Sequence, residues 1–582
     1  MKRTTACFLA AMTAFATATQ AADIFVAPEG RGEMTGADWS NALNGSRDGF
    51  HIDVRAAITS AISGGATEVN VNFAGGSYTI TNQMSLSSIT IPVKLSGGYL
   101  AETDGSFDKG ETATTFARST YNIRFIAATS LSALRIEGIT FSGGYVSYGG
   151  AKGGAVYLDK SATVISNCVF TGNMFAATGK DARSGSVGTL GGGGAVSATT
   201  SGSLYLDDCT FVNNRHVIGG TYNQSCGGAV QGYNVALNVR NSTFRNNFMD
   251  GSAGMNTLFG AAIGTYYGNV SISNCTFTGN YIKGALYGSA ASSGGALAIR
   301  DAKTVHVCDS TFSGNYVANT PSLNPDFTAG IILLDDWNAS DGITTSCVER
   351  CVFDSRNVPA SHVISSSANS KLYTQGDILV CGGRLFMTNN VIFAARGGGT
   401  YSGYSVRSMN SSSSSASFRG YIYSKWTSAP CSLELVNCTI ADGKTYGAAA
   451  LGTGELSVKN CISWGNSVSG VVNAASVTYS CVQEPHDGAG NFVADPHWTG
   501  APYYHLLTKR SGGAITDGWF GGTYNSPKTE KNSPCLDAGA PDKARAALEP
   551  RPNGRRVNLG AYGGTPWASL TLSPPGTMMT VR

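Results

Sequence analysis

Short runs in which apolar and polar residues alternate recur along the chain, and Gly, Asn and Ser flank most of them. One run reads Ile-Ser-Asn-Cys-Thr-Phe-Thr-Gly-Asn and ends at Asn280. A second phrase, Gly-Gly-Ala followed by an apolar residue, precedes it in most copies, as at Gly153–Val156 and Gly193–Val196. Alternation with a period of two predicts short strands, and the flanking residues are typical of turns. The chain is therefore predicted to be all-β.

The unequal spacing of the first phrase narrows the fold. Short strands that repeat every 33–41 residues indicate a solenoid. A propeller competes, but its blades are antiparallel sheets, whereas one strand type with variable insertions favours a right-handed parallel β-helix. Stacked strands then keep a spacing of about 4.8 Å while the turns vary in length. The aromatic positions that mark the repeat are Phe170, Phe211, Phe244, Phe277, Phe312 and Phe353.

Each position of the phrase has an expected structural role. Cys and Phe are two residues apart, so both side chains point to one face of the strand, which is expected to be the interior. The final Asn is expected to hold a left-handed turn and to hydrogen-bond its neighbours in a ladder. The paired Gly of the second phrase is expected to let the chain bend sharply.

Two states are open for the cysteines of the phrase. A buried free Cys behaves as a small apolar residue. Cysteines on adjacent coils also lie within disulfide range, and Cys168–Cys209 is the candidate pair. The cysteines that share this register position are Cys168, Cys209, Cys275, Cys351, Cys438 and Cys461.

The beginning of the chain is predicted to be a secretory signal peptide. Lys2 and Arg3 precede an apolar run, and Thr19–Ala22 supplies small residues for cleavage after Ala21 or Ala22. No later stretch of about 18 apolar residues predicts a transmembrane segment. The mature chain is expected to be secreted, extracellular or at the cell surface. A formal net charge of +3 gives no reason to expect a nucleic acid partner.

The repeats divide the chain into four predicted regions. A helix at Val54–Ile62 and strands at Glu68–Phe73 and Ile89–Leu95 are expected to form an entry cap, because caps shield the open end of a solenoid. A Ser-rich insertion is expected near residues 402–417. The regions are 1–22, the signal peptide; 23–125, the cap and first coils; 126–485, the β-helix coils; and 486–582, the closing segment.

The two phrases together resemble the repeats of the chlamydial polymorphic outer-membrane proteins. In this chain Gly-Gly-Ala-[Val/Ile/Leu] alternates with Phe-x-x-Asn over residues of about 140–320. Those proteins are extracellular β-helical adhesins, so the resemblance implies adhesion. An outer-membrane autotransporter is not expected, because the sequence after Asn466 lacks the run of strands with which those proteins end.

The ends of the chain are similar to a group of bacterial secreted parallel β-helix proteins whose closing segment is associated with a surface anchor. The opening match is Asp23–Pro28 followed by Asp38–Ala42. This resemblance implies the fold and an extracellular location more than a chemistry. The closing matches are Ala494–Trp498, Tyr504–Leu506, Ser533–Gly539 and Asn558–Tyr562.

A candidate ligand surface follows the second phrase. If Val156 and Leu158 face inward, one position of each following strand faces outward, and its neighbours lie about 4.8 Å apart. Aromatic faces can stack on sugar rings and Arg can pair with carboxylates, so a glycan is the expected ligand. An ordinary exposed strand face remains the alternative. The predicted outward row is Asp159, Thr199, Tyr233, Tyr266, Arg300 and Asp335, with the last four as the candidate site.

Catalytic and metal motifs are weaker. β-Helix enzymes of the pectin lyase and hydrolase type resemble this chain only in architecture, and their motifs are not found in it. Asp335 and Asp336 are adjacent and are expected to face opposite sides of a strand. Calcium binding through Asp336, Asn338, Ser340 and Asp341 is conceivable, but the run lacks the sixth-position Gly and the distal Glu of the helix–loop–helix calcium loop, so a plain Asx-rich turn is favoured. The histidines show no metal pattern, so no metal site and no cofactor are expected.

Three functions remain open. The first is a secreted or cell-surface β-helix that binds glycans or other surfaces without catalysis. The second is a polysaccharide lyase or glycoside hydrolase acting through the Tyr233–Tyr266–Arg300–Asp335 row on an extracellular polysaccharide. The third is a structural component of the envelope.

Overall fold

The computed structural model consists of two compact units. One comprises Met1–Gly254 and Ala261–Asn269, and the other Met255–Gly260 and Val270–Arg582. We call them unit 1 and unit 2 and describe each by itself. The residues that the structure describes are 21–101, 107–109, 112–119, 122–147, 152–177, 191–200, 202–218, 223–251, 256–284, 292–319, 328–336, 344–359, 375–394, 403–409, 431–444, 446–451, 454–509, 511–517, 522–551 and 553–570.

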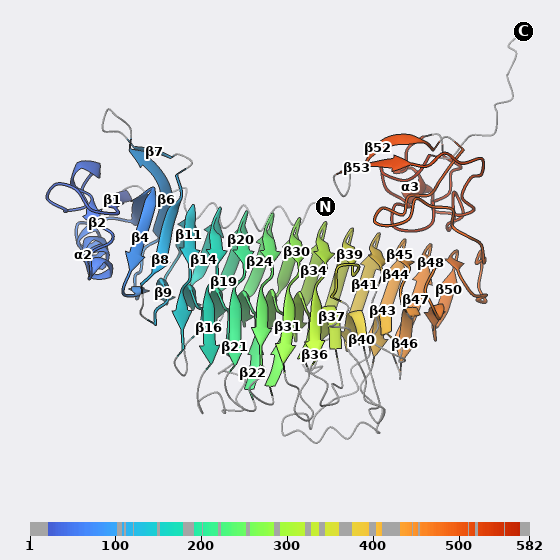
Figure 1. Ribbon diagram of the computed structural model, residues 1–582, viewed down its shortest axis with the longest axis horizontal. Coiled ribbons are helices and arrows are strands. Elements are labelled where there is room, and N and C mark those ends of the chain that lie inside the picture. The colour runs from blue at the N-terminus through green and yellow to red at the C-terminus, as the bar shows by residue number, and fades with distance from the viewer. Residues whose placement is uncertain are drawn as a thin grey trace, which may run out of the picture. The chain divides into compact units, whose positions relative to one another are not determined.

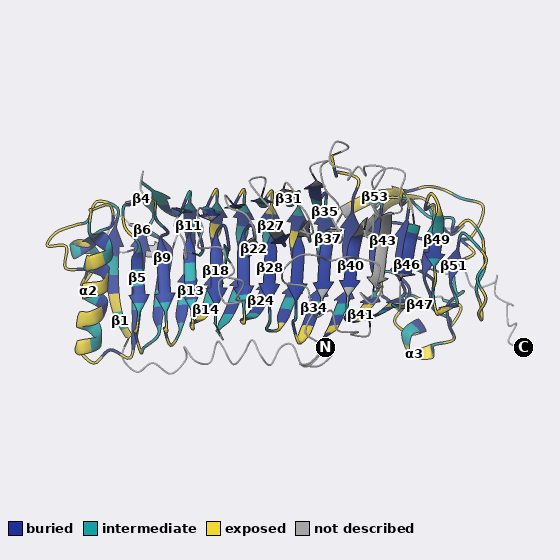
Figure 2. Ribbon diagram, turned by 90° about the horizontal axis from the view of Figure 1, so that it is seen from below, coloured by how far each residue is buried: buried dark blue, intermediate teal, exposed yellow. Residues whose placement is uncertain are grey.

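Unit 1 begins with a helix against the first strands. Helix α2 (Phe50–Ser63) contains the predicted segment Val54–Ile62 and buries Phe50, Val54 and Ile58. Figure 2 shows its outer side exposed beside β1 (Ala21–Ala27). The strand predicted at Glu68–Phe73 is β3 (Glu68–Ala74), whereas the one predicted from Ile89 begins at Val93. Residues 1–20 of the predicted signal peptide lie outside the described part.

Five sheets run through unit 1, and their strands follow one another in the chain order of successive coils (Figure 1). Sheet A comprises β2 (Leu43–Asn44), β1, β3, β6 (Val93–Ala101), β10 (Leu134–Glu137), β14 (Ala162–Ser166), β19 (Ser203–Asp207) and β24 (Ala236–Arg240). Sheet B comprises β4 (Gly76–Ile80), β8 (Thr114–Arg118), β11 (Ile139–Ser142), β15 (Val169–Thr171), β20 (Thr210–Val212) and β25 (Thr243–Arg245). Sheet C comprises β5 (Met84–Ser87), β9 (Ile126–Thr129), β13 (Val156–Asp159), β18 (Val196–Thr199), β23 (Val230–Tyr233) and β28 (Ile263–Tyr266). Sheet D comprises β12 (Tyr145–Val146), β16 (Met174–Ala177), β21 (Arg215–Ile218) and β26 (Phe248–Asp250), and sheet E comprises β17 (Gly191–Gly192) and β22 (Asn223–Cys226).

Unit 2 has the same five kinds of sheet. Sheet A comprises β29 (Val270–Ser273), β34 (Thr304–Cys308), β38 (Thr345–Glu349), β41 (Gly383–Thr388), β44 (Cys431–Val436), β47 (Glu455–Lys459) and β50 (Ser476–Thr478). Sheet B comprises β30 (Thr276–Thr278), β35 (Thr311–Ser313), β39 (Val352–Asp354), β42 (Val391–Phe393), β45 (Thr439–Ala441), β48 (Ile462–Trp464) and β51 (Cys481–Val482). Sheet C comprises β33 (Leu297–Arg300), β37 (Thr328–Asp335), β40 (Gln375–Cys381), β43 (Gly403–Met409), β46 (Tyr446–Leu451) and β49 (Ser469–Val472). Sheet D comprises β31 (Tyr281–Gly284) and β36 (Tyr316–Asn319), and sheet E comprises β27 (Asn256–Phe259) and β32 (Ser292–Ser293).

The pairing within these sheets is parallel, as in β14–β19 and β34–β38. Among the described strands, the antiparallel pairs are β7 (Phe107–Lys109) on β6 and the hairpin β52 (Gly513–Asp517)–β53 (Gly522–Ser526). Successive coils thus contribute strands to sheets A, B and C in turn, and some coils also to sheets D and E, which defines a parallel β-helix and confirms the predicted fold. Strand β43 lies in sheet C, so residues 403–409 belong to a coil and not to the predicted Ser-rich insertion.

The aromatic residues of the repeat form the predicted interior column. In unit 1 the rings of Phe170, Phe211 and Phe244 are fully buried and stack at 4.7 Å, with interplanar angles of 3° and 2°. In unit 2 Phe277, Phe312 and Phe353 stack at 4.8 and 4.9 Å. This spacing is the separation of neighbouring strands in a sheet, so the register of the coils places one ring directly on the next.

The final Asn of each phrase forms the predicted hydrogen-bond ladder. Asn173, Asn214 and Asn247 have no exposed surface. Asn173 Nδ2 donates to Asn214 Oδ1, and Asn214 Nδ2 donates to Asn247 Oδ1. The prediction that this Asn itself adopts the left-handed conformation is wrong. The preceding residue does so instead, as at Gly172 (φ 62°) and Asn213 (φ 55°). That turn leaves the Asn amide free to point inward and satisfy the buried backbone of the coil.

The cysteine column is buried as predicted, and its cysteines are not disulfide-bonded. Neither Cys168 nor Cys209 is in a disulfide, so the candidate bridge is not formed in this structure. Cys209 Sγ donates to the carbonyl oxygens of Ile165, at 3.5 Å, and Asp207, at 3.4 Å. Burial raises the pKa of the Cys209 thiol well above its ordinary value. These cysteines therefore act as small core residues.

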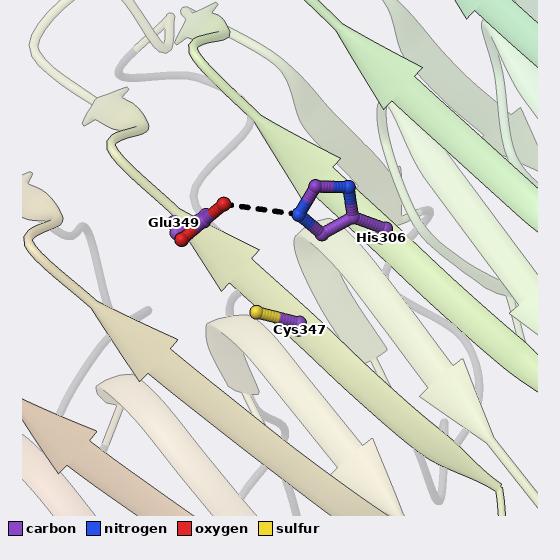
Figure 3. Close-up of side chains that lie close together, drawn as sticks. All are labelled: His306, Cys347 and Glu349. Atoms are coloured by element: carbon purple, nitrogen blue, oxygen red, sulfur yellow. Dashed lines mark hydrogen bonds and ion pairs between the residues drawn. The ribbon is translucent and has the colours of Figure 1, made fainter. Parts of the chain in front are cut away.

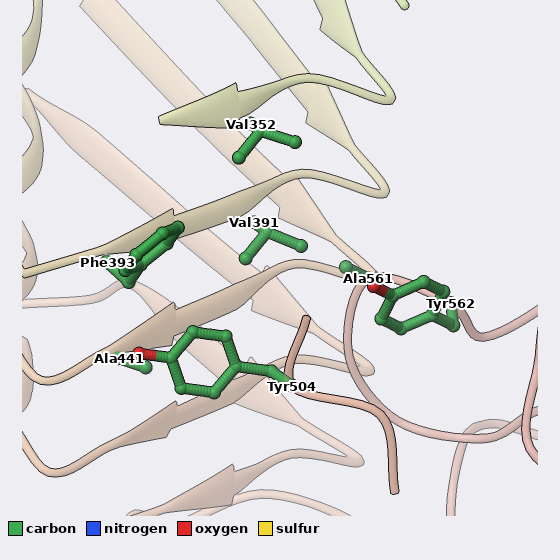
Figure 4. Close-up of a cluster of buried hydrophobic side chains, with 7 residues drawn as sticks. All are labelled: Val352, Val391, Phe393, Ala441, Tyr504, Ala561 and Tyr562. Carbon is green, nitrogen blue, oxygen red and sulfur yellow. The ribbon is translucent and has the colours of Figure 1, made fainter. Parts of the chain in front are cut away.

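The closing segment packs against the outer face of sheet B in unit 2 (Figure 4). Asn389 Nδ2 donates to the carbonyl oxygens of Ala561 and Gly563 at 2.7 and 2.8 Å. A short helix, α3 (Lys543–Ala546), lies in this segment. The sequence motifs of the closing segment therefore serve to pack it against sheet B. The buried cluster comprises Val352, Val391, Phe393, Ala441, Tyr504, Ala561 and Tyr562.

A buried carboxyl group makes the closing segment sensitive to pH. Glu549 is 3% exposed; its Oε1 accepts from the backbone N–H groups of Asn558 and Gly564, while Oε2 has no partner in the described part of the chain. Burial raises the pKa of Glu549 to about 7. Its contribution to stability is therefore complete below about pH 4.5 and is lost as the pH rises through about 7. Between pH 4.5 and pH 8, we expect the free energy of unfolding of wild type to fall by about 3 kcal/mol more than that of Glu549→Gln. Thermal unfolding of both proteins across that pH range measures this difference. Parallel curves of stability against pH would contradict the role given to Glu549.

Candidate functional site

The row predicted to follow the second phrase has the expected register. In unit 1 Asp159 pairs with Thr199, Thr199 with Tyr233 and Tyr233 with Tyr266. In unit 2 Arg300 pairs with Asp335. The sequence thus predicted correctly which residues succeed one another along sheet C. The side chain of Asp335 lies outside the described part of the structure.

The predicted solvent exposure of this row is wrong at three of its members. Thr199 is 3% exposed, Tyr266 is 2% exposed and Arg300 is 1% exposed. In unit 2 strand β27 of sheet E contributes Phe259, and the Arg300 guanidinium lies 4.5 Å from the centre of its ring. A cation held over an aromatic face in a buried site is a stabilising contact. Arg300 therefore has a structural role in this coil.

The same covering occurs in unit 1. Ser197 and Gln231, on the outer face of sheet C, have no exposed surface, and Ser197 Oγ donates to Gln231 Oε1 at 2.7 Å. Strand β17 of sheet E approaches so closely that a Cβ at Gly192 would lie 2.6 Å from Gln231 Cδ. Strand β17 therefore lies over the outer face of sheet C at this point, and Gly192 allows the close contact.

Two members of the row, Asp159 and Tyr233, remain accessible in unit 1. With Tyr157 and Tyr267 they form what we call the tyrosine face. All four are half-buried. Tyr233 and Tyr267 meet edge to face, with ring centres 5.9 Å apart. Thr199 Oγ1 donates to Asp159 Oδ1 at 2.9 Å and lies 3.3 Å from the Tyr157 hydroxyl. These contacts fix the orientation of the aromatic rings.

Burial of the tyrosine face favours neutral hydroxyl groups. It is the main cause that raises the pKa of both Tyr157 and Tyr233 above the ordinary value. The Arg124 guanidinium lies 5.1 Å from the centre of the Tyr157 ring. The face thus combines aromatic surface with hydroxyl donors and one carboxylate, a composition suited to sugar hydroxyl groups.

A second cluster lies on the outer face of sheet A in unit 2 (Figure 3). His306 comes from β34, and Cys347 and Glu349 come from β38. His306 is the register partner of Cys347. Because side chains alternate along a strand, residues 347 and 349 share this face, while Val348 between them is fully buried.

The atoms of this cluster are close enough to act together. One ligand atom from each side chain lies within 4.8 Å of the others. His306 Nε2 is 3.0 Å from Glu349 Oε1. Hydrogen bonds that His306 makes to Cys347 and Glu349 raise the pKa of His306 to about 9, and the hydrogen bond that Glu349 accepts from His306 lowers the pKa of Glu349 to about 2.

Sequence reasoning missed this cluster because its members come from different coils and match no local motif. A signal was available, however. His306 and Cys347 each lie six residues before a stacked Phe of the repeat, Phe312 and Phe353. The repeat register therefore placed them side by side, and the alternation of the strand placed Glu349 on the same face.

Of the four residues predicted to bind calcium, the structure describes Asp336. Asp336 is 7% exposed, and its Oδ2 accepts from the backbone N–H of Thr344 at 2.8 Å. Asn338, Ser340 and Asp341 lie outside the described residues, so calcium binding there stays a prediction.

The stacked sheets and buried ladders place the chain in the class of parallel β-helix proteins. No protein-family model matches the chain, and no curated protein matches it. Among solved structures, the chain is similar to the crystal structure of PfbA, a surface adhesin of Streptococcus pneumoniae, with 12% identity over 83% of this chain and 96% of that chain. The TM-score is 0.32, so no conclusion about this chain is drawn from that similarity. Within the described ranges, no helix has the length and apolar character needed to cross a membrane.

Proposed function

We propose that the protein is a secreted or cell-surface β-helix that binds an extracellular glycan without catalysing a reaction. The observation that supports this most strongly is the tyrosine face of unit 1. Its edge-to-face pair, Tyr233 and Tyr267, is held in place and half open to solvent. The amino-terminal sequence supports an extracellular location, where glycans are the abundant ligands.

The chemistry of the face suits a sugar in two ways. The apolar side of a pyranose ring can pack on an aromatic ring, and two rings at 82° to each other offer two such surfaces. Sugar hydroxyl groups can then donate to Asp159 or accept from a tyrosine hydroxyl. Because packing already orders these side chains, binding costs little side-chain entropy.

The catalytic alternative requires more than one suitably placed group. Glycoside hydrolysis ordinarily uses two carboxyl groups that flank the bond to be cleaved. Asp159 is the carboxylate of the tyrosine face, and it accepts a hydrogen bond from Thr199. Arg300, proposed from sequence for this chemistry, is buried. Binding without catalysis is therefore the function that this geometry supports best.

A panel of neutral and acidic polysaccharides tests the proposal when binding and products are measured in the same samples. Isothermal titration or affinity electrophoresis should detect binding to at least one polysaccharide. Assays for unsaturated products and new reducing ends should stay at the level of a protein-free control. Product formation would instead establish a lyase or hydrolase, and the failure of every polysaccharide to bind would favour a structural role in the envelope.

A further inference from the structure

We propose that His306, Cys347 and Glu349 form a binding site for a zinc-class divalent metal ion. The three side chains offer one nitrogen, one sulfur and one oxygen donor, all within 4.8 Å of one another. Each is half-buried on the outer face of sheet A, so the site is reachable from solvent. The inference does not depend on glycan binding, because the tyrosine face belongs to the other unit.

The observed distances are close to those that a tetrahedral zinc site requires. Zinc lies about 2.0–2.3 Å from nitrogen, oxygen and sulfur ligands, which places pairs of ligand atoms about 3.3–3.6 Å apart. His306 Nε2 and Glu349 Oε1 are already 3.0 Å apart. Closing the remaining separations requires movements of about 1 Å, which rotation of side chains on two paired strands can supply.

A second set of residues holds the carboxylate in a suitable orientation. Arg350 Nη1 lies 3.1 Å from Glu349 Oε2, so Glu349 turns its other oxygen toward His306. Arg350 is itself fixed by two hydrogen bonds to Asp309, at 2.6 and 2.8 Å. Outer partners of this kind orient the ligands of protein metal sites.

Cys347 differs from the cysteines of the core. Among the free cysteines of the described residues, it is the one that is not buried. The small apolar role that explains Cys168 and Cys209 therefore does not explain it. Its register partner on the following strand is Phe386, which is 36% exposed. A thiol between an imidazole and an aromatic side chain has a polar partner on one side and an apolar neighbour on the other.

The donor set selects the class of metal. Thiolate and imidazole ligands favour zinc and related transition metals, whereas calcium and magnesium prefer oxygen ligands alone. Three protein ligands leave the fourth tetrahedral position of zinc for water or for a group of a bound partner. On binding, the Cys347 thiol and Nε2 of the His306 imidazole each release a proton to solvent, and the hydrogen bond between His306 and Glu349 is replaced by two bonds to the metal.

Cobalt(II) provides the test because its spectrum reports the ligands. The purified chain, first freed of metal with a chelator, is titrated with Co²⁺ and then with Zn²⁺. We expect one Co²⁺ to bind with a tetrahedral visible spectrum and a sulfur-to-cobalt charge-transfer band, and Zn²⁺ to displace it. Cys347→Ser should abolish the sulfur band and weaken binding by at least about 100-fold, and Arg350→Ala should weaken it by about 10-fold or more.

Two further variants keep the result interpretable. His306→Gln should weaken Co²⁺ binding, but at saturating Co²⁺ this variant should still show the sulfur-to-cobalt band, because Cys347 is present. The matched control is His486→Gln, because His486 Nε2 forms a similar pair with Glu484 Oε1 at 3.3 Å and is not part of a three-residue cluster within the described residues. Circular dichroism confirms that each variant is folded. Failure of wild type to bind Co²⁺, a spectrum without the sulfur band, or unchanged binding by Cys347→Ser would overturn the assignment.

Discussion

Replacing His216 by Phe should remove most of the acid sensitivity of unit 1. The imidazole has no exposed surface, packs on the Phe175 ring with centres 4.8 Å apart, and makes no hydrogen bond through either nitrogen in the described structure. Burial lowers the pKa of His216 to about 3, and the neighbouring Cys226 backbone offsets little of that effect. The histidine is therefore neutral in the folded protein at pH values where the unfolded chain binds a proton.

The direction of the effect follows from this difference. An unfolded-state pKa near 6.5 and a folded-state pKa near 3 mean that stability is complete above about pH 6.5 and is lost as the pH falls toward 3. The full loss is about 4–5 kcal/mol. Between pH 7 and pH 3, we expect the free energy of unfolding of His216→Phe to decrease by about 4–5 kcal/mol less than that of wild type, as measured by urea denaturation. His216→Gln should show the same reduced loss of stability in acid. If the stability of both variants decreases in parallel with that of wild type, the explanation is contradicted.

Asn214→Ala should be among the most destabilising substitutions in the coils of unit 1. Asn214 Oδ1 accepts from the backbone N–H and from Nδ2 of Asn173, at 3.1 and 2.9 Å. Its Nδ2 donates to the carbonyl oxygen of Phe170 and to Asn247 Oδ1, both at 2.9 Å. Removal of this amide leaves several buried polar groups without partners, at a cost of about 1–3 kcal/mol each and about 4 kcal/mol in total after relaxation.

Asn238→Ala is the matched control for the ladder, because Asn238 is half exposed on the outer face of sheet A. We expect its effect on the free energy of unfolding to be within about 0.5 kcal/mol. Urea denaturation of both variants, followed by circular dichroism, gives the comparison. Equal effects of the two substitutions would show that the buried ladder does not stabilise the coils.

The repeated features of this fold were predictable because each copy of the phrase reports the same local environment. Phe211 recurs in register with its neighbours, so its place in an interior column followed from alternation and strand spacing alone. The ladder at Asn214 followed in the same way. The position of the left-handed residue was misplaced by one, because both Gly-Asn and Asn-Asn end the phrase and either residue of the pair can adopt that conformation.

Features that depend on the turns were not predictable from the repeat. Arg300 was placed in the correct row, but its burial depends on Phe259, which belongs to a strand of the long turn preceding that row. Tyr266 was also placed in the correct row but is buried, because sequence periodicity does not report what covers the outer face of a sheet. The His306–Cys347–Glu349 cluster combines two coils, and its local sequence contains no metal motif. The cluster could have been located by aligning successive repeats and noting which residues occupy the same register position.

Glycan binding through the tyrosine face is the central functional claim, and a pair of tyrosine variants tests it most directly. Tyr233→Ala removes one ring of the edge-to-face pair in unit 1. Tyr316→Ala is the control, because Tyr316 is also half-buried and stacks on another tyrosine, Tyr281, at 5.2 Å in unit 2. Affinity for the polysaccharide that wild type binds is measured by isothermal titration. We predict binding about 10-fold weaker or more for Tyr233→Ala, a loss of about 1.4 kcal/mol, and unchanged binding for Tyr316→Ala. Unchanged binding by a folded Tyr233→Ala would contradict the account.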